Sequence, residues 1–173
     1  PGVGYRMWTD DTMVSFTGSF NAGNIGVSLL RTDGQGYGWN FVGNPYPASI
    51  DWTELNITEA SSVENAFWMW LPTSRSYGSF SAATNIPINI SSSIIPSNHG
   101  FLVKVKKELG SGSITFSPGA QVGNSTSYLK SASTREVAPH FKLAGVSSSF
   151  RDELAIAFVD EASLGLDKFD MEK

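Results

Sequence analysis

Apolar and polar residues alternate along most of this chain, which is the pattern of β-strands with one face on a core and the other in water. The alternation is clear over residues 14–20 and 25–29, and it returns at 101–105. Residues 67–71 are apolar at every position. That run predicts either a central strand covered on both faces or a strand with one aromatic face exposed for a purpose.

Turn and helix signals between these segments complete the predicted architecture. Gly110, Ser111 and Gly112 predict a hairpin that leads into residues 114–116. Asp51 stands three residues before Glu54, a spacing that starts a helix, although the sequence beyond it supports only a turn or two.

Roughly eight to eleven short strands spaced by turn residues predict an all-β fold. We expect an antiparallel β-sandwich of jelly-roll or similar Greek-key type, with at most one or two short helices, and a closed barrel is the structural alternative. The 173 residues are enough for one main core. We expect residues 1–135 to form the sandwich. Residues 136–173 hold a strand pair and an acidic loop, which either complete the sandwich or begin a following module.

Composition limits the partners and the cellular location. Charged residues make up 16% of the chain, against about a quarter in an average domain, and a surface rich in Ser, Thr and Asn suits an extracellular β-protein. The net charge is −4, so no basic field attracts nucleic acid, and no apolar run is long enough to insert into a membrane. Cysteine is absent, which removes disulfides and thiolate nucleophiles.

Few residues suggest catalysis. His99 and His140 are the only imidazoles, and the serines around them lack the Gly-x-Ser-x-Gly pattern of a nucleophile elbow. Carboxylate pairs exist, but neighbouring side chains on a strand point to opposite faces, so nothing in the sequence brings an acid and a nucleophile together. We therefore expect no enzyme activity and no catalytic residues.

An acidic cluster near the C-terminus is a candidate calcium site, because Ca²⁺ prefers several hard oxygen ligands from one loop. The alternative is a solvated acidic loop that caps the last strand. Calcium is the one cofactor that the sequence suggests. The candidate ligands are Asp160, Glu161, Asp167 and Asp170.

Aromatic residues are the other candidate functional groups, because sugar-binding modules stack the flat faces of sugars on exposed Trp and Tyr rings. Trp68 and Trp70 would share one face of a strand, whereas Tyr46 and Trp52 lie near a loop and are the better candidates. The alternative, which we favour, is that such rings fill the core of a domain that has no disulfides.

The Gly-Asn-Pro-Tyr-Pro turn at 43–47 and the acidic tail at 152–170 carry a resemblance to a known group of proteins. With the segments around them, they look like the β-rich region of large secreted proteins of Bacteroidetes, upstream of a C-terminal type IX secretion sorting domain. The resemblance implies a secreted or cell-surface location and relatives that continue beyond this segment. The other segments that carry it are 4–8, 14–18, 38–42, 67–70, 100–104 and 113–116.

Two classes of function follow. The first is a non-catalytic structural or adhesive module of a secreted bacterial cell-surface protein, whose partners are other domains of that protein or neighbouring surface proteins. The second is a carbohydrate-binding module attached to a surface protein that degrades polysaccharide. A structural module should bury its tryptophans and expose an apolar patch or an open strand edge, whereas a binding module should expose aromatic rings beside polar groups.

Overall fold

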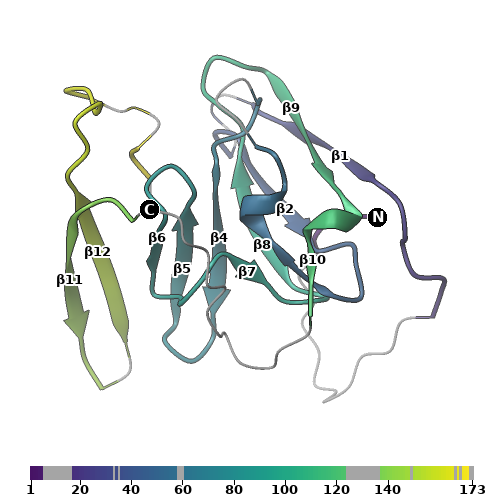
Figure 1. Ribbon diagram of the computed structural model, residues 1–173, viewed down its shortest axis with the longest axis horizontal. Coiled ribbons are helices and arrows are strands. Elements are labelled where there is room, and N and C mark those ends of the chain that lie inside the picture. The colour runs from purple at the N-terminus through teal and green to yellow at the C-terminus, as the bar shows by residue number, and fades with distance from the viewer. Residues whose placement is uncertain are drawn as a thin grey trace.

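A computed structural model shows an antiparallel all-β protein that is consistent with a sandwich (Figure 1). No helix in the part of the chain that it describes is long and apolar enough to span a membrane. The described residues are 1–5, 17–32, 34, 36–57, 61–123, 137–148, 150–165, 167 and 169–171.

The described residues form short strands joined by turns, with two 3₁₀ helices of one turn each. The strands are β1 (Ile25–Leu30), β2 (Trp39–Gly43), β3 (Ser49–Asp51), β4 (Ala66–Leu71), β5 (Ser76–Ser81), β6 (Ile86–Ile88), β7 (Ile94–Ile95), β8 (Gly100–Lys104), β9 (Ser111–Phe116), β10 (Gln121–Val122), β11 (His140–Val146) and β12 (Arg151–Ala157). The helices are η1 (Trp52–Glu54) and η2 (Pro118–Ala120).

The largest sheet has five antiparallel strands in the order β2-β8-β4-β5-β6, so the apolar run at 67–71 lies in its central strand, as predicted. Two smaller sheets, β1-β9 and β10-β3-β7, contribute side chains to the same core. Phe101 of β8 meets Phe116 of β9 with ring centroids 6.3 Å apart, and Trp52 of η1 packs against Phe67 of β4 at 5.5 Å.

One face of the five-stranded sheet therefore points into a core, and we call the opposite face its outer face. The core side chains come from all three sheets and from both 3₁₀ helices. They are Val27, Leu29, Val42, Tyr46, Ile50, Trp52, Leu55, Val63, Phe67, Met69, Phe80, Ile95, Phe101, Val103, Val105, Ile114, Phe116 and Ala120.

The turn that follows β2 is held by the side chain of Asn44, which is 6% exposed. Its amide group donates to the carbonyl oxygens of Ala48 and Pro96 at 2.9 and 3.0 Å, and its oxygen accepts from the backbone N–H of Tyr46 at 3.0 Å. One buried amide thus replaces the backbone partners that the chain loses where it turns.

The helix predicted at Asp51 is present as the single turn of η1. The Asp51 carboxylate accepts from the backbone N–H of Thr53 at 3.0 Å, which caps that turn. The hairpin predicted around Gly110–Gly112 is wrong. Strand β8 pairs with β2 and β4, whereas β9 pairs with β1, so the chain crosses between sheets at these glycines. Of the strand predicted at 14–20, residues 14–16 lie outside the described residues, and 17–20 form no strand.

The strand pair predicted near the C-terminus is the hairpin β11–β12, whose seven cross-strand pairs make a separate two-stranded sheet. It joins none of the three sheets of the sandwich. Figure 1 shows it beside β6, the edge strand of the five-stranded sheet. The hairpin is thus attached to the sandwich edge rather than inserted into a sheet.

Candidate interaction surfaces

Two of the four proposed sugar-binding residues are core residues. Tyr46 and Trp52 are each 1% exposed. The Tyr46 hydroxyl lies 2.8 Å from the carbonyl oxygens of both Gly23 and Phe116, and burial raises its pKa. The Trp52 indole donates to the side chain of Asn65 at 2.9 Å. The expectation that Tyr46 and Trp52 present rings to a sugar is wrong, because the turn after β2 and helix η1 fold their side chains inward.

Trp68 and Trp70 share the outer face of β4, as the strand period requires, but they differ in exposure. Trp68 is 2% exposed, whereas Trp70 is 48% exposed. Trp39 lies against Trp68, with ring centroids 4.6 Å apart and an angle of 81° between the planes. The prediction that Trp68 forms a sugar platform is therefore wrong, and of the four candidates only Trp70 has an accessible ring.

The C-terminal segment faces one end of the outer face across a cavity. A cavity of about 580 Å³ lies between Trp68 and Ser81 on the sheet and Ala155 of β12 and Phe169 of the loop beyond it. No hydrogen-bond acceptor among the described residues reaches the buried indole N–H of Trp68. The segment that follows β12 thus lies opposite the Trp68 end of the outer face.

The other end of the outer face carries exposed aromatic rings. Trp70 and its cross-strand partner Tyr77 are 48% and 43% exposed, and their ring centroids are 5.2 Å apart at 67°. Phe41 of β2 is 38% exposed, and its ring lies over Gly100, where an added Cβ would come 2.4 Å from the Phe41 Cζ atom. We call Phe41, Trp70 and Tyr77 the aromatic strip. Strand period places Trp70 on the same face as Trp68. The sequence indicates neither the register that brings Phe41 and Tyr77 to that face nor that this end stays uncovered.

A second exposed apolar surface lies on the hairpin β11–β12. Phe141 pairs with Ile156 and Leu143 with Leu154, so their side chains share one face, and Phe158 continues it with its ring centroid 6.1 Å from that of Phe141. These five side chains, which we call the hairpin face, are 40–62% exposed. The sequence predicted the strand pair, but alternation does not reveal which side of the pair the sandwich covers.

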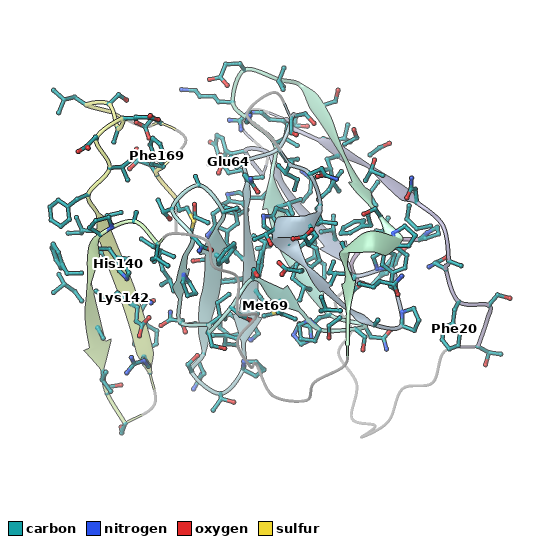
Figure 2. The ribbon with its side chains drawn as sticks, viewed as in Figure 1. Phe20, Glu64, Met69, His140, Lys142 and Phe169 are labelled. Atoms are coloured by element: carbon teal, nitrogen blue, oxygen red, sulfur yellow. The ribbon has the colours of Figure 1, made fainter. Side chains whose placement is uncertain are left out.

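The hairpin attaches to the sandwich through polar contacts centred on Glu153, whose carboxylate accepts from the backbone N–H of Asn89 at 3.0 Å and from Arg151 at 2.5 Å. Lys142 lies 3.9 Å from the same carboxylate and also donates to the carbonyl oxygen of Pro87 in β6. Figure 2 labels Lys142 on β11, in the hairpin that flanks β6. The hairpin thus docks by its polar side and leaves its apolar side to solvent.

These contacts also set the protonation of Glu153. Burial acts to raise the pKa of its carboxyl group, but the N–H of Asn89 and the cationic side chains of Arg151 and Lys142 outweigh burial. The pKa of Glu153 therefore lies below its ordinary value. The carboxylate is therefore charged at neutral pH.

The proposed calcium ligands do not converge, and no group of three potential metal-binding side chains forms among the described residues. Asp167 uses its carboxylate locally, because it accepts from the backbone N–H groups of Ser163 at 2.6 Å and Phe169 at 2.8 Å. Asp170 accepts from the N–H of Asp167 at 2.9 Å. The structure does not bring the proposed ligands together, and two of these carboxylates accept hydrogen bonds from the loop's own backbone. The four residues concerned are Asp160, Glu161, Asp167 and Asp170.

The two histidines have unrelated environments. His99 precedes β8 and is partly buried, and burial lowers the pKa of its imidazole. His140 begins β11 and is exposed, with its Nδ1 atom 2.9 Å from the carbonyl oxygen of Ala138.

A family model described as a domain of unknown function, DUF8693, matches residues 4–173. No curated protein and no solved structure matches the chain. The matched range contains the sandwich, the aromatic strip and the hairpin face.

Proposed function

The chain belongs to the DUF8693 family, and we propose that it is a non-catalytic structural or adhesive module of a secreted bacterial cell-surface protein. Its role is to dock against a neighbouring domain of the same protein. The hairpin face is the observation that carries this proposal. The cell-surface location is supported by the resemblance of the sequence to secreted proteins of Bacteroidetes.

The hairpin face has the chemical composition of one side of a protein–protein interface. Its five side chains are aliphatic or phenylalanine rings, without a hydroxyl or amide group to orient a small ligand. Strand β11 has β12 as its strand partner among the described residues, so its other edge offers backbone hydrogen bonds. An isolated two-stranded hairpin is marginally stable in water, and covering this face would stabilise it.

The size of the hairpin face favours a domain of the same polypeptide as the partner. Five large side chains at these exposures present roughly 400 Å² of apolar surface, if each spans about 150–200 Å² when free. A stable complex between separate proteins buries about 800 Å² on each partner. A domain held nearby by the chain needs less area, because the linker supplies a high effective concentration.

Photo-crosslinking in the intact surface protein tests this proposal. A photoreactive residue at Leu143 should crosslink to another domain of the same polypeptide, identified by mass spectrometry. The matched control is Leu109, which is similarly exposed but lies on a loop of the sandwich. Equal yields at the two positions would overturn the proposal. The substitution Leu143→Lys should abolish a crosslink formed from a photoreactive residue at Leu154 without changing the unfolding midpoint, because Leu143 is 56% exposed.

A further inference from the structure

We infer that the aromatic strip of Phe41, Trp70 and Tyr77 binds a neutral carbohydrate chain. The inference concerns the outer face of the five-stranded sheet and does not depend on the role proposed for the hairpin face. It replaces the four candidate residues of the sugar-binding hypothesis with one surface. Trp70 belongs both to those candidates and to the aromatic strip.

The strip runs across the strands rather than along one of them. Trp70 and Tyr77 are cross-strand partners on β4 and β5. The pairing of Trp68 with Leu102 sets the register of β4 and β8, and this register places Gly100 opposite Trp70. Because the ring of Phe41 occupies the space above Gly100, the three rings span the adjacent strands β8, β4 and β5. Three strands cover about 10 Å, which suits an extended chain rather than a single small molecule.

The chemistry of the strip suits a neutral sugar. The C–H groups on the face of a pyranose ring carry partial positive charge, and the face of an aromatic ring is electron-rich. Trp70 and Tyr77 also carry an N–H and an O–H group that suit the hydroxyls at the rim of a sugar. The strip residues and the residues opposite Phe41 and Trp70 are uncharged, which suits a neutral ligand. Those opposing residues are Leu102 and Gly100.

The contrast with the Trp68 end of the same face supports a role for the exposed rings. There Trp39 packs against the buried Trp68, and the segment that follows β12 lies across a cavity from it. At the Trp70 end, large aromatic surfaces stay in water, although burying each would be worth about 1.5–3 kcal/mol. The same sheet thus covers one tryptophan and presents another, two residues apart.

A glycan array of neutral hexose, pentose and N-acetylhexosamine polymers, probed with the intact chain, tests the inference. The best ligand is then titrated while tryptophan fluorescence is followed. Trp70→Ala and Tyr77→Ala should each weaken binding at least tenfold while leaving the unfolding midpoint within a few degrees. Trp70→Phe keeps a ring and removes the N–H, so it should weaken binding less than Trp70→Ala.

The matched control is Phe158→Ala, which removes a comparably exposed ring from the hairpin face. It should leave glycan affinity unchanged. The inference is overturned if no neutral glycan on the array binds, if the Trp70→Ala/Tyr77→Ala double variant binds normally, or if Phe158→Ala weakens binding as much as Trp70→Ala. None of these results would alter the crosslinking expected at Leu143, so the two proposals fail separately.

Discussion

The sandwich and the hairpin β11–β12 are built from the same alternation of apolar and polar residues, yet they use it in opposite ways. In the sandwich, the apolar side of each strand faces the core, and Phe101 and Phe116 are 0% exposed. In the hairpin, the polar side with Glu153 faces the protein, and Phe158 is 62% exposed. Alternation therefore specifies two chemically different faces, but the neighbouring elements decide which face is covered.

The largest expected difference between the two regions is in the cost of removing a phenylalanine ring. Phe101→Ala should lower the free energy of unfolding by about 3–5 kcal/mol, because it empties a fully buried site between β8 and β9. Phe158→Ala should change it by less than about 0.5 kcal/mol. Urea denaturation of both variants measures the difference. A similar loss in the two would mean that the hairpin face is covered in the isolated chain.

Substitution of the buried Asn44 tests how much the turn after β2 contributes to the stability of the sandwich. Asn44→Ala should cost about 1–3 kcal/mol, because it leaves two carbonyl oxygens and the N–H of Tyr46 without their buried partner. Asn44→Asp is the matched control. Aspartate keeps an oxygen that can accept from the N–H of Tyr46 but loses the amide group that donates to the two carbonyl oxygens. Its cost in free energy of unfolding should therefore differ from that of the alanine variant. A midpoint of unfolding unchanged by Asn44→Ala would contradict this account of the turn.

The smallest expected effect is the response of the hairpin to acid. Because the pKa of Glu153 is lower in the folded protein than in the unfolded chain, its contribution is present above the ordinary pKa of 4.5 and is lost as pH falls through the lower folded value. The backbone amide resonance of Asn89, which donates to Glu153, should therefore shift with an inflection below pH 4.5.

Glu153→Gln should abolish that inflection while leaving amide resonances of the core strand β8 in place, because it removes the titrating group and keeps a side chain of the same size. An inflection at or above the ordinary glutamate pKa would show that the cationic partners do not stabilise the carboxylate. It would then favour a hairpin that is attached by packing rather than by charge.

The local strand patterns were predictable from sequence because they rest on backbone geometry. A period of two identified β1, β8 and the strand pair β11–β12, the continuous apolar run identified the central strand β4, and the Asp51 cap identified η1. These features depend on residues within a few positions of one another. The antiparallel all-β class followed from them.

Strand partners and burial were decided by tertiary structure, because both depend on segments distant in the chain. The glycines at 110–112 signalled a turn but not the strand that would receive it, and β9 pairs with β1, more than eighty residues earlier. Trp68 and Trp70 are equivalent in a period-two pattern, but the C-terminal segment lies opposite one and leaves the other exposed. By itself the sequence determined where several of the strands run and what each of their faces carries. Packing determined which rings are buried in the core and which stay exposed and available to a partner, because burial depends on the surroundings of a residue as well as on its type.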